Sequence, residues 1–295
     1  KLKKILLITS ELPPQPGGIG THAHQLAKHL SKSYEVKVVS DQRSGVGDEE
    51  KQFDSQQDYQ IQRIEREKLI LVTYLNRIRV TLNLVKHFDM VLVSGKFPLW
   101  LTGIIKKKYK HIPIIGIIHG TEVLLANKYL RKLTDNSLLK LDAVIGVSNY
   151  TLKLVDYLEL ENTFVIPNGI EVEKEYQGAK QIKENEQINF ITVGNLTQRK
   201  GQHNFIKALP KLIKNYPNIK YHIVGIPTNK NQIQKLAKDL KVENCIQIHG
   251  RVSEEEKNKL LDEAHIFVML SERTASGDVE GFGIAVLEAN HKSLP

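Results

Sequence analysis

The stretch Glu280-Gly-Phe-Gly-Ile-Ala-Val-Leu-Glu288 is the part of the sequence from which the fold and its site can be worked out. It follows a polar loop at residues 271–278, and the apolar run that starts at Ile284 predicts the beginning of a helix. Gly281 and Gly283 allow the backbone to approach a ligand closely. Because the unpaired N–H groups of a helix start favour anions, the stretch predicts a binding site for a phosphate group.

Glu280 and Glu288 place a carboxylate on either side of this predicted helix start. Carboxylates repel phosphate, but they accept hydrogen bonds from hydroxyl groups such as those of a sugar or a ribose. The two residues are equally compatible with a solvated loop glutamate and a glutamate in the first helical turn, where the helix dipole favours an acid. The Gly-Phe-Gly between them and the motifs upstream favour the ligand-binding interpretation.

The overall composition predicts a globular protein of two domains. The chain has 295 residues, of which 41% are hydrophobic. No apolar run approaches the roughly 18 to 20 residues of a membrane span, and the first residues lead directly into a strand-like pattern, unlike a signal peptide. The single Cys245 excludes an internal disulfide and fits the reducing cytoplasm, and Cys–His zinc spacing is absent.

The net charge of +9 is unevenly distributed. Residues 1–170 contain 24 Lys/Arg and 17 Asp/Glu, whereas residues 171–295 contain 18 and 16. A basic first half is compatible with nucleic acid, an anionic membrane surface or a phosphorylated acceptor as a partner. It is equally compatible with ordinary solvated lysines.

The first half opens with the pattern of a Rossmann-like unit. A strand is predicted at 3–9, a Pro- and Gly-rich loop at 10–20, a helix at 21–31 and a strand at 36–40. The loop contains Gly17-Gly-Ile-Gly20, which is not the G-x-G-x-x-G dinucleotide pattern. Its Gly18 is suited to bringing backbone N–H groups to a phosphate, and a plain connecting loop is the alternative.

The rest of the first half alternates predicted helices and strands. We expect a mobile polar loop at 41–58, helices at 68–86 and 98–109, and strands at 90–93, 112–118, 143–147 and 164–166. His119 directly follows one of these strands. Open parallel sheets bind their ligands at this edge, although a lone loop histidine is more often an ordinary hydrogen-bonded residue.

A turn signal at Pro167-Asn-Gly169 and a polar stretch at 171–187 predict the domain boundary, after which the pattern repeats. Strands are predicted at 188–193, 220–224, 246–249 and 266–270, and helices at 202–215 and 232–240, with a third starting at Ser253. Alternating strands and helices in both halves predict an α/β protein with two parallel-sheet domains facing each other.

Several strand ends of the second half carry glycine, cations or carboxylates. Arg199 and Lys200 lie between a predicted strand and a predicted helix, where two cations are suited to holding a diphosphate. Gly225, Arg251 and Glu280 follow the other strands. Because the carboxyl ends of parallel strands share one sheet edge, we expect these residues to line one site.

These motifs together resemble the retaining glycosyltransferases of family 4, which have two Rossmann-like domains facing across a cleft, the GT-B fold. The resemblance runs along the whole chain and rests on six motifs: Gly17-Gly18, His119-Gly120, Pro167-Asn168-Gly169-Ile170, Gly194 with Arg199-Lys200-Gly201, Gly250-Arg251-Val252-Ser253, and Glu280 through Glu288. Each motif is weak alone, and in this order and spacing the set is specific.

The resemblance implies an acceptor-binding domain at residues 1–170 and a domain that binds a UDP- or GDP-linked sugar at residues 171–295. It implies that Arg199 and Lys200 hold the diphosphate without a metal or cofactor, and that Glu288 accepts from the ribose. It also implies that Glu280 touches the sugar and that His119 lies near the reacting carbon. The implied donor-binding residues are Gly18, Gly194, Asn195, Arg199, Lys200, Gly225, Arg251, Val252, Glu280, Phe282, Gly283, Ile284 and Glu288.

The sequence departs from the family pattern at its end. Family members continue for several elements after the Glu280–Glu288 motif, whereas this chain stops at Pro295. We therefore interpret the second domain as C-terminally truncated. The alternatives are a nucleotide-sugar-binding fragment without turnover and a GT-B-type nucleotide-sugar epimerase. A nucleic-acid binder is disfavoured because aromatic residues make up only 6% of the chain.

The resemblance also extends to the acceptor, which in this family is often a glycan or is linked to a lipid. The basic stretch Ile104-Ile-Lys-Lys-Lys-Tyr-Lys110 lies in the predicted acceptor domain. Cationic segments are attracted to anionic bilayers. We therefore expect this stretch to contact the inner membrane face peripherally.

Overall fold

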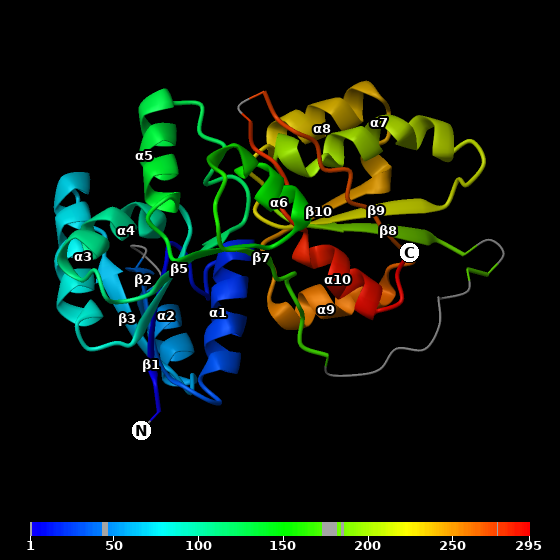
Figure 1. Ribbon diagram of the computed structural model, residues 1–295. Helices are drawn as coiled ribbons and strands as arrows, with labels where there is room; N and C mark the ends of the chain where they lie inside the picture. The colour runs from blue at the N-terminus through cyan, green and yellow to red at the C-terminus, as the bar shows by residue number, and fades with distance from the viewer. Residues whose placement is uncertain (1, 43–46, 173–181, 184–185, 276) are drawn as a thin grey trace. The chain divides into compact units, whose positions relative to one another are not determined.

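The computed structural model describes residues 2–42, 47–172, 182–183, 186–275 and 277–295. The chain divides into two compact units, Lys1–Asn168 and Gly169–Pro295, and each is a parallel sheet flanked by helices (Figure 1). Among the described residues, every helix is too short or too polar to span a bilayer. The predicted α/β class with two Rossmann-like sheets is thus confirmed.

The first unit is organised around β1, an interior strand of a seven-stranded parallel sheet in the order β3-β2-β1-β4-β5-β6-β7. Leu7 of β1 is in register with Val38 on one side and Leu92 on the other. The continuous apolar run of β1 follows from this position, because an interior parallel strand is buried on both faces. The strands are β1 (Lys4–Thr9), β2 (Glu35–Gln42), β3 (Gln60–Glu65), β4 (Met90–Ser94), β5 (Ile114–Ile118), β6 (Ala143–Gly146) and β7 (Thr163–Val165).

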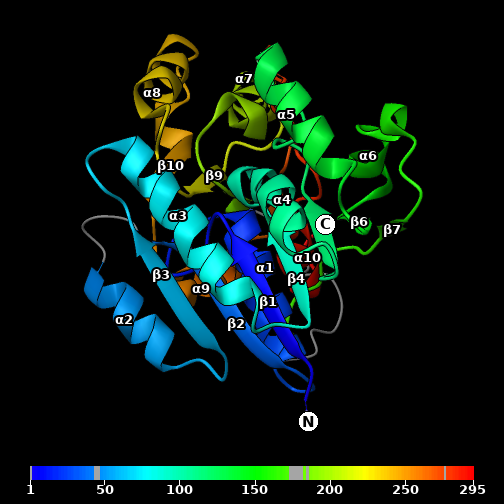
Figure 2. The ribbon, with the colours of Figure 1, turned by 60° about the vertical axis from the view of Figure 1, so that its left-hand side comes forward.

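Helices cover both faces of this sheet. The helices are α1 (Gly18–Leu30), α2 (Gly47–Ser55), α3 (Ile70–Val85), α4 (Lys96–Lys108), α5 (Lys128–Leu138) and α6 (Asn149–Lys153), with a 3-10 turn at Asp156–Leu158. Leu7 packs with Ala23 and Ala27 of α1 on one face, and Leu6 packs with Leu99 of α4 on the other. Alternate residues of β1 therefore serve the two cores. Figure 2 shows α3 and α4 lying across the strands of this sheet.

The second unit repeats the plan with four parallel strands in the order β10-β9-β8-β11. Its strands are β8 (Ile188–Val193), β9 (Ile219–Val224), β10 (Ile246–Gly250) and β11 (Ile266–Phe267). Its helices are α7 (Gln202–Leu212), α8 (Lys230–Asp239), α9 (Glu254–Glu263) and α10 (Ile284–His291). Two 3-10 turns lie at Gln198–Lys200 and Glu243–Cys245. Helices α7 and α8 pack on one face and α9 and α10 on the other (Figure 1).

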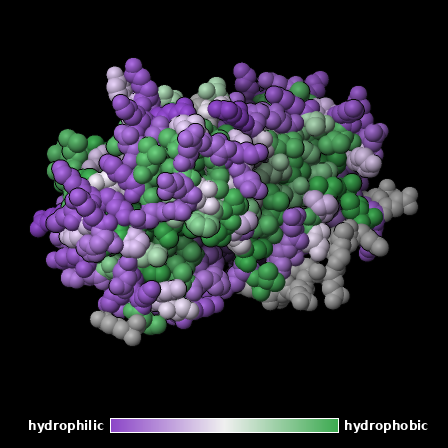
Figure 3. Space-filling view, viewed as in Figure 1, coloured by the Kyte–Doolittle hydropathy of each residue, from purple (hydrophilic) through white to green (hydrophobic). Residues whose placement is uncertain are grey.

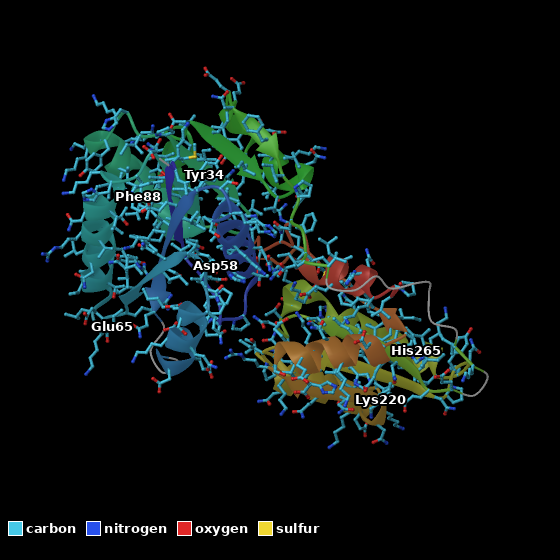
Figure 4. The ribbon with its side chains drawn as sticks, turned by 90° about the horizontal axis from the view of Figure 1, so that it is seen from below. Tyr34, Asp58, Glu65, Phe88, Lys220 and His265 are labelled. Carbon is cyan, nitrogen blue, oxygen red and sulfur yellow. The ribbon has the colours of Figure 1, made fainter. Side chains whose placement is uncertain are left out.

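The predicted loop at 41–58 is wrong over most of its length. Residues 43–46 lie outside the described part, but α2 occupies Gly47–Ser55, and β3 (Gln60–Glu65) follows it. Figure 4 labels Asp58, just before this strand, and Glu65 at its end. The helix is polar, so its apolar periodicity is too weak to be recognised. Helix α5 escaped the sequence analysis for a related reason, since Thr134 and Ser137 make up most of its buried face, which therefore lacks an apolar stripe.

An ion cluster secures α2 to β3. The Arg63 side chain, 7% exposed, donates to the Asp54 carboxylate at 2.8 Å and lies 3.3 Å from Glu50 Oε1. Glu50 is buried, and its Oε1 also accepts a hydrogen bond from the Gln15 side chain at 3.0 Å. A buried carboxylate needs such partners, because an unpaired charge inside a protein is strongly destabilising.

Replacing Arg63 should therefore destabilise the first unit. Arg63→Ala removes a buried cation that pairs with both Glu50 and Asp54, and we expect the free energy of unfolding to fall by roughly 3–5 kcal/mol in urea denaturation. The control is Lys51→Ala, which removes an exposed ion pair with Asp48 at 3.9 Å and should change stability by less than about 0.5 kcal/mol. Equal effects of the two substitutions would contradict the role of Arg63.

Candidate functional site

The loops that follow the strands of the second unit meet at one edge of its sheet. Gly225, after β9, has φ +144°, and a Cβ atom there would lie 2.3 Å from the Gly194 carbonyl oxygen after β8. Gly201 has φ +69°, and a Cβ atom on it would lie 1.7 Å from the Leu270 carbonyl oxygen. Only glycine fits these contacts. The Asn195 side chain joins two of the loops, since its Oδ1 accepts from Ile226 N at 3.2 Å.

Arg199 and Lys200 lie in the 3-10 turn after β8, and their charged groups meet two carboxylates of the loop before α10. Lys200 Nζ lies 2.6 Å from Glu280 Oε2, the Arg199 guanidinium also pairs with Glu280, and Arg199 Nε donates to Asp278 Oδ2 at 3.1 Å. The two predicted phosphate ligands are thus brought together, and a carboxylate already occupies the position between them. Asp278 and Glu280 both act here as partners of cations.

Helix α10 begins beside this cluster without a side-chain cap. Its N-cap, Gly283, has φ +85°, and the first turn contains no acidic residue. The unpaired N–H groups and the positive end of the dipole therefore remain available to a ligand. The predicted helix start at Ile284 is correct, and Phe282 before it is half-buried.

Glu288 lies further along α10, where it pairs with a cation that the sequence analysis missed. Its Oε1 accepts from Lys257 Nζ of α9 at 2.7 Å, and Lys257 also contacts Glu254 at 2.7 Å. Burial lowers the pKa of Lys257, but Glu288 and Glu254 outweigh it and the net shift is upward. Lys257 thus fixes the position of the Glu288 carboxylate, whose oxygens are hydrogen-bond acceptors.

The two predicted residues after β10 differ in their surroundings. Arg251 is exposed, whereas Val252 packs against the apolar core beneath α9 and α10. Val252 is therefore better placed to support the loop than to present its side chain to a ligand. The opposite edge of this sheet, marked by Lys220 and His265 in Figure 4, carries none of the predicted ligand-binding residues.

In the first unit, His119 follows β5 and contacts residues of β4, of α1 and of its own loop. Its Nε2 lies 2.9 Å from Ser94 Oγ at the end of β4, and its ring meets the His22 ring edge-on at 5.0 Å between centroids. The backbone N–H of His119 donates a short hydrogen bond to the Glu122 carboxylate. Sequence reasoning identified His119 but missed the contributions of Ser94, His22 and Glu122.

Burial controls the protonation of this group. It lowers the pKa of His22 to about 4, and burial together with the charge of His22 lowers the pKa of His119 to about 3. Burial raises the pKa of Glu122 to about 7, against the hydrogen bond from His119 N. Both imidazoles are therefore neutral at physiological pH, so either ring can accept or donate one hydrogen bond to a sugar hydroxyl.

Gly18 is the first residue of α1, so the predicted loop at 10–20 ends earlier and the helix starts three residues before the predicted Thr21. A Cβ atom on Gly18 would meet nothing within 4 Å, whereas one on Gly17 would lie 2.2 Å from Glu11 Oε2. The start of α1 has no side-chain cap and no acid in its first turn. It is therefore a second helix start that is suited to an anion.

The first unit also contains a partly open cavity of about 700 Å³ at the carboxyl ends of β1, β2 and β3, between α3 and α4. Its wall includes the aromatic pair Tyr74 and Phe97, stacked at 4.9 Å, with the Arg77 guanidinium over both rings. Arg77 and Arg66 both bind the Asp41 carboxylate. The sequence analysis gave no sign of this cavity, because its residues come from five separate segments.

The protonation of Glu122 predicts a specific pH dependence of stability. Its pKa is higher in the folded protein than the ordinary value of 4.5, so between pH 4.5 and about 7 the folded state binds more protons and stability falls as pH rises. Glu122→Gln removes this pH dependence. Between pH 4.5 and about 7, the difference in the free energy of unfolding between wild type and the variant should therefore change by up to roughly 1.4 kcal/mol per pH unit.

The measurement is urea denaturation of wild type and Glu122→Gln at several pH values from 5 to about 8. The lowered pKa values of His22 and His119 act in the opposite direction, but both proteins share them and they cancel in the difference. Parallel stability curves for the two proteins would show that Glu122 does not carry this proton.

This chain is similar to known proteins both in sequence and in structure. A GDP-mannose-dependent phosphatidylinositol monomannoside mannosyltransferase of Corynebacterium glutamicum is 26% identical over 99% of this chain and 79% of its own length. A related mannosyltransferase of Mycolicibacterium smegmatis is 25% identical over the same shares. Among solved structures, HepE of Anabaena in complex with UDP and glucose has a TM-score of 0.76 at 16% identity, over 99% of this chain and 79% of that one.

Family models cover both units. Residues 173–295 match the model described as Glycosyl transferases group 1, and residues 16–174 match the model described as Glycosyltransferase Family 4. The second of these matches alone spans more than half of the chain. This protein therefore belongs to glycosyltransferase family 4, and it is a glycosyltransferase built from two Rossmann-like domains of the GT-B type.

Proposed function

We propose that this protein transfers a hexose from a nucleotide-diphosphate sugar to a glycan or lipid-linked acceptor, with retention of configuration at the anomeric carbon. The observation that carries the proposal is the meeting of Arg199 and Lys200 with Glu280 beside the uncapped start of α10. Two cations and a helix start are suited to stabilising a leaving diphosphate.

In this proposal the diphosphate takes the place that the Glu280 carboxylate holds between Arg199 and Lys200. Both cations are largely buried, with side-chain exposures of 22% for Arg199 and 13% for Lys200. Each therefore needs an anionic partner, whether that is Glu280 or the diphosphate of the donor. Once displaced, Glu280 becomes available to accept hydrogen bonds from the sugar hydroxyls. Glu288, oriented by Lys257, accepts from the ribose.

The donor we propose is GDP-mannose. The supporting observation is that the mannosyltransferases named above, whose names specify GDP-mannose, align with 99% of this chain. HepE of Anabaena binds UDP, but at 16% identity its likeness concerns the fold. These relatives are transferases, which supports turnover over a binding-only fragment or an epimerase.

The acceptor is proposed to bind to the first unit. The neutral His119 and the first turn of α1 at Gly18 offer hydrogen-bonding groups at one edge of its sheet, and the cavity beneath α3 and α4 lies at the same edge. Because the related mannosyltransferases carry a phosphatidylinositol mannoside in their names, we propose a lipid-linked acceptor and peripheral association with an anionic membrane.

The phosphate role of Arg199 and Lys200 can be tested by nucleotide binding. Arg199→Ala and Lys200→Ala should each weaken binding of GDP and of GDP-mannose about tenfold or more in calorimetry, because a charge-assisted hydrogen bond contributes roughly 1.5–3 kcal/mol. Lys211→Ala, an exposed lysine of α7, is the control and should bind both ligands like wild type. Unchanged GDP affinity in both variants would exclude the diphosphate site.

A second experiment should distinguish the roles of Glu280 and Glu288 by nucleotide binding and turnover. Glu288→Gln should weaken GDP and GDP-mannose alike, because the ribose is common to both. Glu280→Gln should leave GDP affinity no weaker, since it removes a competing anion, and should lower turnover with GDP-mannose. Glu255→Gln, exposed on α9, serves as the control. A Glu280→Gln variant with wild-type turnover would refute the role of Glu280 toward the sugar.

A further inference from the structure

Helix α3 has the reverse of the usual arrangement of polar and apolar side chains over its first turns. Thr73 and Thr81 face inward and are 3% and 1% exposed. Leu71 and Leu75 of the helix, and Leu69 directly before it, are 72%, 65% and 70% exposed. A helix at a protein–water boundary normally turns its apolar stripe inward, so the outer face of α3 requires a different explanation.

The inner face of α3 is polar because it forms a wall of the cavity in the first unit. Thr73, Arg77 and Thr81 all line that cavity. The hydroxyl oxygens of Ser40 and Thr81 are buried there without a hydrogen-bond partner among the described residues. The cavity therefore holds unsatisfied hydrogen-bonding groups that a polar ligand, such as the head of a glycolipid, would satisfy.

The outer face of α3 forms an exposed apolar patch, which we call the α3 patch and define as Leu69, Leu71 and Leu75. In Figure 3 a hydrophobic area lies at the upper left, over the beginning of α3 in Figure 1. Contiguous apolar surface of this kind marks a site of interaction. The exposed residues Lys68 and Ile70 are part of the cavity wall, so the patch adjoins the cavity.

The charges around the α3 patch indicate an anionic partner. Arg66, Lys68 and Arg79 are exposed beside it. Tyr129 at the start of α5 is 73% exposed, next to Leu130, which also lines the cavity. Leucines flanked by cations and an exposed tyrosine are the composition of a surface that lies in the interfacial layer of an anionic membrane.

The basic stretch at 104–110, by contrast, is a poorer candidate for membrane contact. Ile105 is fully buried. Lys106 is 16% exposed, and its ammonium group pairs with Asp142 at 2.6 Å and donates to Ile112 O at 3.0 Å. Part of this stretch is therefore committed to holding α4 against the neighbouring strand.

We propose that the α3 patch inserts into the interfacial layer of an anionic bilayer, with the adjoining cavity receiving the polar head of a lipid-linked acceptor. The identity of that acceptor rests on the proposed function, whereas insertion of the α3 patch rests on its own exposure and charge. The insertion brings a lipid headgroup to the carboxyl edge of the first sheet without extracting the lipid from the membrane.

The test is co-sedimentation with phosphatidylcholine vesicles that contain a quarter phosphatidylglycerol. Wild type should bind, and the double variant Leu71→Ser, Leu75→Ser should lose at least about tenfold in partitioning, because burying each leucine side chain is strongly favourable. The control is Leu2→Ser, Leu139→Ser, which changes two leucines of the same unit that are 62% and 56% exposed. It should bind like wild type.

Equal binding of the two double variants would overturn the proposal, as would wild-type protein that fails to bind these vesicles. A concentration-dependent dimer in light scattering that only the α3 variant loses, with vesicle binding unchanged, would assign the patch to a second copy of the chain instead. Two further measurements distinguish this proposal from the proposed function. They are the affinity for GDP and the turnover of GDP-mannose with an acceptor that is dispersed in detergent. Vesicle binding without transfer would count against the function alone, and transfer without vesicle binding against the membrane surface alone.

Discussion

The candidate donor site depends on how closely the ends of β8 and β9 approach each other. Gly194 N donates to Val224 O at 2.8 Å and Gly225 N donates to Gly250 O at 2.8 Å, so the backbone ladder continues one residue beyond each strand. A side chain at Gly225 would collide with the backbone at Gly194 and push the two loops apart. Because the 3-10 turn with Arg199 and Lys200 follows β8 directly, its position relative to the start of α10 depends on this contact.

The structure resolves an electrostatic problem that such a site creates. Two cations held close together in a partly buried turn repel each other, and each loses hydration. Glu280 and Asp278 supply the compensating charge from the loop before α10. In the proposed function, an incoming diphosphate exchanges one anion for another, so the two cations are already in place when the donor binds. The interaction between Glu280 and the two cations is thus of the same kind as the one proposed to bind the donor.

The first unit uses burial for a different purpose. His22 and His119 are kept neutral by desolvation, and Glu122 is kept close to its protonation midpoint at neutral pH. Neutral groups can form hydrogen bonds to an uncharged hydroxyl without the larger desolvation cost of an ion. The same sheet edge carries the cavity beneath α3, whose inner wall is polar and whose outer surface is apolar. A polar interior and an apolar exterior suit an amphiphilic acceptor.

The sequence alone determined the parallel α/β architecture, because strands buried on both faces appear as short, continuous apolar runs such as that of β1. It also determined which residues follow the strands, and therefore that Arg199, Lys200 and Glu280 share one sheet edge. It did not determine that Glu280 pairs with both cations, that Lys257 holds Glu288 or that Ser94 supports His119, since these contacts join residues far apart in the chain. Polar α2 was missed because its attachment depends on ion pairs with Arg63 of β3 rather than on an apolar stripe. The spacing of α3 correctly predicted a helix, but periodicity does not indicate which face is inside. Only the tertiary structure decided that Thr73 and Thr81 line a cavity while Leu71 and Leu75 face outward, because that choice depends on what surrounds the helix.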